Sequence, residues 1–230
     1  MDNNDDNDGG SGGGDYDDIL YTTIEYWRGL VNELKIFVEN GLSLISNREL
    51  DSDSNKGITE LGFKLIIVCC LGNNLAVYKD LIIESEREVE NGRIDLFLYN
   101  PKKKTAIVIE LKYIRIGFLE STKEAYKLGY KEKHKAWGKE DNRISLLNVK
   151  DKGNINVRQY TTINMNTNEK EMKLISIRSI WKEASKQATR YCKALREGDI
   201  RKIDADIRLF RVVIIGVGKS VICVGLHEFE

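Results

Sequence analysis

Residues that build metal clusters or disulfide frameworks are scarce in this chain, which has two histidines and four cysteines among 230 residues. No two cysteines are spaced as Cys-x-x-Cys, and His134 and His227 are isolated from them, so the spacing of a zinc site is absent. We expect reduced and mostly buried thiols. The longest apolar run, from Leu65 to Leu71, is far too short for a membrane span. The acidic, polar N-terminus resembles neither a signal peptide nor a transit peptide, so we expect a soluble intracellular protein without membrane contact.

Net charge is also absent, but its distribution is uneven. Residues 1–18 hold seven aspartates and no basic residue. Without these seven, 36 basic residues face 29 acidic ones, which leaves about +7 on the remaining chain. A moderately basic body is compatible with a polyanionic partner. The first residues are also rich in Asn and Gly and lack apolar side chains, so we expect residues 1–18 to form a disordered acidic tail before a single domain over 19–230.

Apolar periodicity predicts the helices of that domain. Helical spacing runs from Tyr16 to Ser46, with a break near Gly29 or Gly41 left open, and continues after a polar loop in residues 57–72. Residues 179–197 form a clearly amphipathic helix that stops at Gly198. Residues 119–178 are polar and charged, and we interpret them as a variable insertion. It is helical over 119–140 and forms an inserted hairpin or a mobile lobe over 141–178.

Short runs rich in β-branched and aromatic residues predict the strands. The runs at 93–99 and 105–113 flank an Asn-Pro-Lys turn and should form an antiparallel hairpin. The second run is almost continuously apolar, which indicates a strand covered on both faces. Further strands are expected at 76–83, 209–217 and 221–226. The predicted fold is therefore α/β, with a mixed sheet flanked by helices.

Three ionisable residues interrupt the apolar strands of the hairpin. Glu110 and Lys112 are two apart on one strand, so both side chains leave the same face, and Asp95 lies on the preceding strand. An ionisable group inside a buried strand is costly unless it is paired or binds a metal. Two carboxylates and an ammonium group in one place therefore indicate a functional site.

Phosphodiester hydrolysis suits this set of groups. Asp95, Glu110 and the backbone carbonyl of Leu111 can supply oxygen ligands to Mg²⁺, for which Mn²⁺ can substitute. Such an ion polarises the phosphate and lowers the pKa of an attacking water. Lys112 would hold that water or stabilise the charge that develops on phosphorus. If Lys112 is poorly solvated, its pKa should fall.

The string Gly92-Arg93-Ile94-Asp95, then fourteen residues, then Glu110-Leu111-Lys112 resembles the PD-(D/E)xK nuclease superfamily. The branch with G-R-x-D as its first motif is the most similar; it includes nuclease domains of AAA-ATPase-like and effector proteins. The resemblance implies a restriction-endonuclease-like fold with an insertion after the core motif. Ile94 stands where most members have proline.

The same resemblance assigns roles to residues outside the hairpin. Glu60 lies where members often carry a glutamate that reaches the metal through a water. Gln187 and Tyr191 resemble the Q-x-x-x-Y of the helix after the core motif, which flanks the active site and whose glutamine helps to position groups there. Arg93 and Tyr191 are the candidate contacts to nucleic acid.

Structural alternatives remain open for these residues. Asp95 and Lys112 could form a cross-strand salt bridge that serves only the fold. Glu60 could be a helix-start acid favoured by the macrodipole, with Thr59 as the cap. Gln187 could be a solvated helix residue.

Two further alternatives concern basic residues. Arg93 could pair with Glu88 or Glu90 instead of a phosphate. Lys102, Lys103 and Lys104 could be a solvated hairpin tip, with phosphate contact as the second interpretation.

The sequence as a whole predicts a Mg²⁺-dependent endonuclease that acts on nucleic acid, with DNA favoured and RNA left open. Two alternatives belong to other classes. One is a catalytically inactive nuclease fold that binds nucleic acid or protein. The other is an effector or toxin-like domain that a partner activates. A protein partner or a homodimer is compatible with each of them.

Overall fold

The computed structural model describes residues 14–45, 59–74, 80–90, 92–160, 172–198 and 203–230. Its helices are α1 (Gly14–Ser43), α2 (Glu60–Asn74), α3 (Tyr130–Leu146), α4 (Val149–Gly153) and α5 (Ile177–Glu197), with two 3-10 helices, η1 (Ile116–Phe118) and η2 (Glu120–Lys127). Its strands are β1 (Ile82–Val89), β2 (Gly92–Asn100), β3 (Thr105–Ile114), β4 (Asn156–Tyr160), β5 (Met172–Ser176), β6 (Arg208–Val217) and β7 (Ser220–Phe229). No described helix is long and apolar enough to cross a bilayer.

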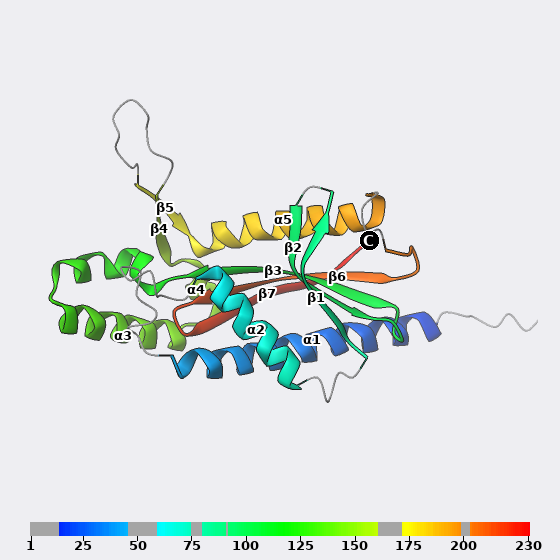
Figure 1. The fold of residues 1–230 in the computed structure, drawn as a ribbon, viewed down its shortest axis with the longest axis horizontal. Helices are drawn as coiled ribbons and strands as arrows, with labels where there is room; N and C mark the ends of the chain where they lie inside the picture. Colours follow the sequence, from blue (N-terminus) through cyan, green and yellow to red (C-terminus); the bar gives the residue numbers. More distant parts are fainter. Residues whose placement is uncertain (1–13, 46–58, 75–79, 91, 161–171, 199–202) are drawn as a thin grey trace, which may run out of the picture.

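A five-stranded sheet with the order β1-β2-β3-β6-β7 forms the centre of the molecule (Figure 1). Its two central strands, β3 and β6, pair in parallel, and the other neighbours pair antiparallel. Helix α5 lies over one face, and α1 and α2 lie against the other. The predicted restriction-endonuclease-like α/β fold, with a mixed sheet between helices, is therefore confirmed.

Strand β3 is covered on both faces, as its apolar sequence predicts. Ile107, Ile109 and Leu111 pack with the apolar residues of α1 and α2. Ala106 and Val108 face the opposite way and pack with α5. Because side chains alternate along a strand, the next even positions, Glu110 and Lys112, leave β3 on the α5 side.

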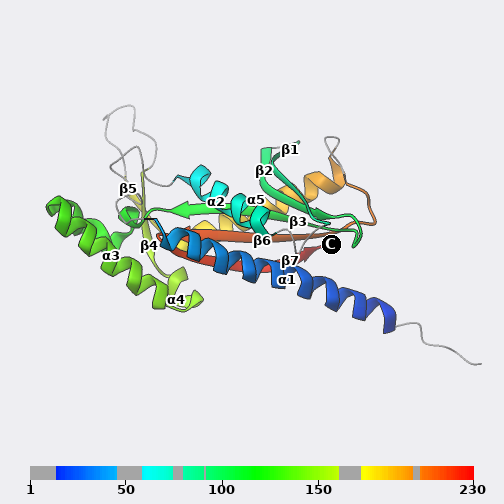
Figure 2. The ribbon, with the colours of Figure 1, turned by 60° about the horizontal axis from the view of Figure 1, so that its bottom comes forward.

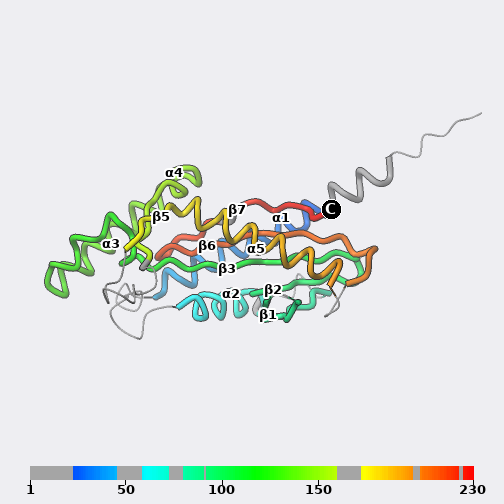
Figure 3. Tube along the Cα trace, turned by 90° about the horizontal axis from the view of Figure 1, so that it is seen from above, coloured from blue at the N-terminus to red at the C-terminus, as the bar shows by residue number. Residues whose placement is uncertain are grey.

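The insertion gathers at one end of the sheet. Figure 2 shows α3, α4 and the β4–β5 hairpin at the end of the molecule opposite the C-terminus. Seen from above in Figure 3, α4 lies beside the start of α5, with which it is in contact. The inserted hairpin is observed as an antiparallel β4–β5 pair, and Ser176 caps α5 directly after it by accepting a hydrogen bond from Ser179 N–H at 3.2 Å.

Several predicted boundaries need correction. The strand expected at 76–83 overlaps an observed strand only at Ile82 and Ile83. Residues 75–79 lie outside the described residues, and the strand there is β1, residues 82–89. β1 lies at the edge of the sheet and carries charged residues at half of its positions, so it lacks the apolar signature of a central strand. The helix expected over 119–140 divides into η2 and α3, and α3 continues to Leu146.

The N-terminal helix continues through both glycines at which a break was considered. Trp27, Leu34 and Val38 are buried and pack the C-terminal part of the helix against the sheet. Residues 1–13 of the predicted tail and the loop at 47–56 lie outside the described residues, whereas residues 14–18 already belong to α1.

The described cysteines only partly match the expectation of buried thiols. Cys69, Cys70 and Cys192 are all free thiols. Cys192 is buried, but Cys69 is exposed and Cys70 is half-buried.

Candidate active site

The opening between β2 and β3 places the two predicted carboxylates together. The antiparallel pairs of these strands end at Leu96 and Ile109. Asp95 and Glu110 are the next residues beyond that pair. The Leu111 N–H, which the β2 ladder does not use, donates to Asp95 Oδ2 at 2.9 Å. The backbone of β3 thus holds the Asp95 carboxylate beside Glu110 and Leu111.

Glu110 is the most unusual group in the site. Its side chain is 0% exposed, yet neither carboxylate oxygen accepts a hydrogen bond from a described donor. Lys112 Nζ lies 2.8 Å from Oε1 and forms an ion pair with it. Burial, helped by the charge of Asp95 and opposed by Lys112, raises the pKa of Glu110 to about 7. A buried carboxylate without hydrogen-bond donors is costly unless another ligand satisfies it.

Lys112 is a permanent cation in this environment. Its side chain is 26% exposed, and Nζ lies 3.7 Å from Glu60 Oε1 in addition to its contact with Glu110. Burial opposes its charge, but the carboxylates of Glu110, Glu60 and Asp95 outweigh burial and raise the pKa of Lys112. The expectation of a lowered pKa is therefore wrong, because it did not count the acids around the ammonium group.

No ion pair joins Asp95 to Lys112 within the described residues. Asp95 instead accepts the Leu111 N–H, and Lys112 contacts Glu110 and Glu60. The cross-strand salt bridge considered as a structural alternative is not the arrangement that the fold adopts.

Glu60 combines a structural role with a position in the site. Thr59 begins α2 as its cap, because Thr59 Oγ1 accepts a hydrogen bond from Gly62 N–H at 3.2 Å. Glu60 follows in the first turn, where the helix dipole favours an acid. Its carboxylate, 50% exposed, also faces Lys112. Glu60 therefore both lies in the first turn of α2, as the structural alternative predicts, and faces the site.

Lys64 and Glu86 extend the site in a way that sequence reasoning missed. Lys64 is buried one helical turn after Glu60, and its ammonium group pairs with Glu86. Glu86 has a φ of 56°, rare for a residue with a side chain, and stands between the β1–β2 pairs that flank Asp95. A lysine within the apolar helix 60–74, one turn after Glu60, was the available signal.

Glu86 also holds Arg93, whose Nη1 lies 3.4 Å from Glu86 Oε2. The partners expected for Arg93, Glu88 and Glu90, do not form this pair. The Arg93 side chain remains 64% exposed, so it is accessible to a ligand.

The family-like residues of α5 support the strand that carries Asp95. Gln187 Nε2 donates to the Tyr191 hydroxyl at 2.6 Å, so Gln187 is not a freely solvated side chain. The buried Tyr191 ring packs on Gly92, where a Cβ would lie 3.2 Å from the ring. Gly92 has a φ of 145°, a conformation that favours glycine. The structure therefore explains why glycine occupies the first position of the G-R-x-D string.

The lysines of the β2–β3 turn are exposed, as a hairpin tip should be. Lys102 and Lys104 form ion pairs with Asp80 and Asp206, at 2.8 Å and 2.6 Å. This turn joins β2 and β3 at the end of their paired region opposite Asp95 and Glu110.

Asp95, Glu110 and the Leu111 carbonyl form an oxygen donor set suited to a hard divalent cation that retains several waters. The buried Glu110 oxygens without donors fit such an ion. Among the described residues, no three His, Cys, Asp or Glu side chains converge as a ready cluster. Water or substrate oxygens would therefore complete the coordination.

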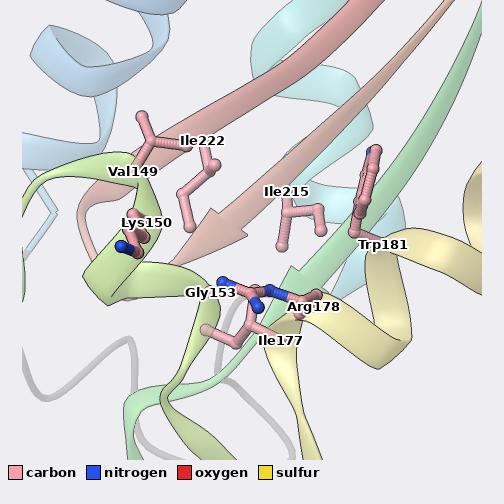
Figure 4. Close-up of a pocket in the computed structure, with 8 residues that line it drawn as sticks. All are labelled: Val149, Lys150, Gly153, Ile177, Arg178, Trp181, Ile215 and Ile222. Atoms are coloured by element: carbon pink, nitrogen blue, oxygen red, sulfur yellow. The ribbon is translucent and has the colours of Figure 1, made fainter.

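Two cavities lie on either side of the first turn of α5. The cavity in Figure 4, about 400 Å³, is apolar, and none of its lining residues is acidic, so it offers no ligand to a cation. The other, about 360 Å³, reaches Lys112 and Glu60. We call it the insertion groove; its lining residues are Glu60, Lys112, Tyr113, Ile114, Phe118, Val157, Arg158, Gln159, Ile175 and Ile180.

Comparison with known proteins supports the interpretation of this geometry. Residues 63–160 match the family model of the PD-(D/E)XK nuclease superfamily. No curated protein and no solved structure matches the chain. The matched segment runs from α2 to β4 and includes the site hairpin and the first part of the insertion. The resemblance to the PD-(D/E)XK nuclease superfamily, inferred from the residues, is thus supported by a family-model match over residues 63–160, which contain Asp95, Glu110 and Lys112.

Proposed function

We propose that this chain is a metal-dependent endonuclease that hydrolyses phosphodiester bonds of nucleic acid, with DNA the favoured substrate. The observation that carries this proposal is the buried Glu110 carboxylate, which lacks hydrogen-bond donors and lies beside Asp95 and Lys112. The ion pair with Lys112 reaches Oε1, whereas Oε2 has no partner among the described residues. Glu110 and Asp95 would hold a cation, which would compensate for the burial of this carboxylate.

Asp95, Glu110 and the Leu111 carbonyl would hold Mg²⁺ or Mn²⁺, and Glu60 would contribute through a water. When bound, such an ion polarises the scissile phosphate and acidifies the attacking water. Lys112 remains protonated and stabilises the negative charge that develops on the phosphate oxygens.

Other residues would position the substrate or the site. Arg93 is exposed and would contact a backbone phosphate. Gln187 would position groups through Tyr191, to which it donates a hydrogen bond. Tyr191 is buried, and both its ring and its hydroxyl lie against Gly92, so it would support the strand that carries Asp95.

The test is cleavage of supercoiled plasmid, single-stranded DNA and RNA by the purified protein in Mg²⁺, Mn²⁺ or EDTA. We expect cleavage that EDTA abolishes and that Asp95→Asn removes. Lys102→Ala, at the exposed hairpin tip, is the matched control and should cut like the wild type. Binding without cleavage under every metal would favour an inactive nuclease fold. Cleavage that appears only with added cell extract would favour activation by a partner.

A further inference from the structure

The insertion groove lies next to the cluster of charged residues. Lys112 and Glu60 lie at its β3 and α2 side, and η1, β4, β5 and the first turn of α5 contribute the remaining walls. The segment 119–178, which interrupts the core fold, therefore forms part of the surface that a substrate meets beside Lys112.

The chemistry of the groove differs from that of a phosphate-binding surface. Five of its lining side chains are apolar, and one of them, Phe118, is a half-buried aromatic. These side chains are Ile114, Phe118, Val157, Ile175 and Ile180. A charged sugar-phosphate backbone gains nothing from such walls, whereas the flat face of a nucleobase does, because base–aromatic stacking is favourable for every base.

The β4–β5 hairpin forms one wall of the groove, and contacts between described residues hold β4 in place. Val157 forms a backbone bridge with Leu119, and the Arg158 guanidinium donates to the Gly117 carbonyl. The same guanidinium lies 5.1 Å from the centroid of the Tyr126 ring. β4 is therefore fixed to η1 and η2, and the groove is preorganised on that side.

Gln159 adds a polar group to the apolar walls. It is exposed on β4, one residue after the anchored Arg158, and its amide can both donate and accept hydrogen bonds. Amide side chains pair well with the edges of unpaired bases.

We propose that the insertion groove binds an unpaired nucleobase next to the phosphate that is cleaved, so that the substrate is single-stranded or locally unpaired nucleic acid. The part of this inference that concerns cleavage rests on the proposed nuclease function. In a duplex the faces of the bases are already covered by stacking, so a base must leave the stack before it can enter the groove. Phe118 supplies the stacking surface, and Gln159 contacts the edge of the base.

The test compares one labelled oligonucleotide, alone and annealed to its complement, as DNA and as RNA. Binding is measured by fluorescence anisotropy with Ca²⁺, and cleavage under single turnover with Mg²⁺ or Mn²⁺. Phe118→Leu keeps an apolar side chain but removes the ring, and should weaken single-strand binding by about tenfold while duplex binding changes little. Phe118→Tyr should restore it. Tyr130→Leu, an exposed aromatic on α3 outside the groove, is the control and should leave both unchanged.

Gln159→Ala provides a second variant on the exposed hairpin and should lower single-strand affinity by about threefold, as for one hydrogen bond. Equal binding and cleavage of duplex and single strand, with no response to Phe118→Leu or Gln159→Ala, would overturn the inference and leave the nuclease standing. Phe118-dependent binding of single strands without cleavage under any metal would keep the groove and overturn the nuclease. Absence of both would overturn both. A preference between the DNA and RNA arms identifies the sugar without altering the inference.

Discussion

Replacing Glu110 by glutamine should change how the stability of the metal-free protein depends on pH. In the folded protein, burial raises the pKa of Glu110 from 4.5 to about 7. A carboxyl group whose folded pKa is raised contributes stability that is fully present below its unfolded pKa. That contribution is lost as the pH rises through the folded pKa. The wild type should therefore lose stability between about pH 4.5 and pH 7, and Glu110→Gln, which cannot ionise, should not.

The size of the effect follows from the shift. A difference of roughly 2.5 pKa units corresponds to about 3 kcal/mol of unfolding free energy, as an order of magnitude. The variant also removes the carboxylate nearest to Lys112, although Glu60 remains close to that ammonium group. The attraction between ionised Glu110 and Lys112 is already contained in the folded pKa of about 7, so the quantity to compare is the slope and not the stability at one pH.

Urea unfolding in EDTA at several values between pH 5 and pH 8.5 measures this slope. We expect the stability of Glu110→Gln relative to wild type to increase by about 2–3 kcal/mol from pH 5 to pH 8.5. Glu183→Gln is the control, because a hydrogen bond from Lys186 lowers the pKa of this exposed acid and gives no loss on the alkaline side. Parallel stability curves for wild type and Glu110→Gln would refute the argument that Glu110 is an unsatisfied buried acid. Addition of Mn²⁺ at pH 8 should then stabilise the wild type by about 2.7 kcal/mol at a hundredfold excess over Kd, and the variant much less.

Asp95→Asn should weaken Mn²⁺ binding at least tenfold in calorimetric titration, because an amide oxygen replaces a charged ligand; wild-type affinity would contradict its role. Gly92→Ala should destabilise the fold by about 2 kcal/mol in urea unfolding. The new Cβ would contact the Tyr191 ring, and the φ of 145° at Gly92 is unfavourable for alanine. An unchanged unfolding midpoint would show that the backbone at Gly92 is not constrained. Deleting residues 1–18 should tighten nucleic-acid binding at low salt, because the loss of seven negative charges leaves a body of about +7. Equal affinity across a salt series would remove the idea of a screening tail.

The hairpin that carries the site could be predicted because two signals coincide in it. Apolar runs on both sides of an Asn-Pro-Lys turn predict paired strands, and ionisable residues inside those runs conflict with burial. This conflict singled out Asp95, Glu110 and Lys112 before any geometry was known. The even spacing of Glu110 and Lys112 also predicted their shared face, and their neighbours on β6, Val213 and Ile215, pack in one cluster with residues of α5.

The errors concern features that depend on neighbours distant in sequence. β1 carries charged residues because it is an edge strand, and its position at the edge is a property of the whole sheet. The raised pKa of Lys112 depends on Glu60, fifty-two residues earlier in the chain, which reaches it only through the packing of α2. Glu86 and its pair with Lys64 were missed for the same reason.

Single-turnover cleavage by Lys112→Ala, measured beside Mn²⁺ binding by the same protein, tests the central claim most directly. Lys112 has its ammonium group against Glu110 and Glu60, where it can stabilise charge on a bound phosphate. Its removal should slow cleavage by about a hundredfold or more while Asp95 and Glu110 still bind Mn²⁺. Cleavage at the wild-type rate by a folded Lys112→Ala protein would contradict the account.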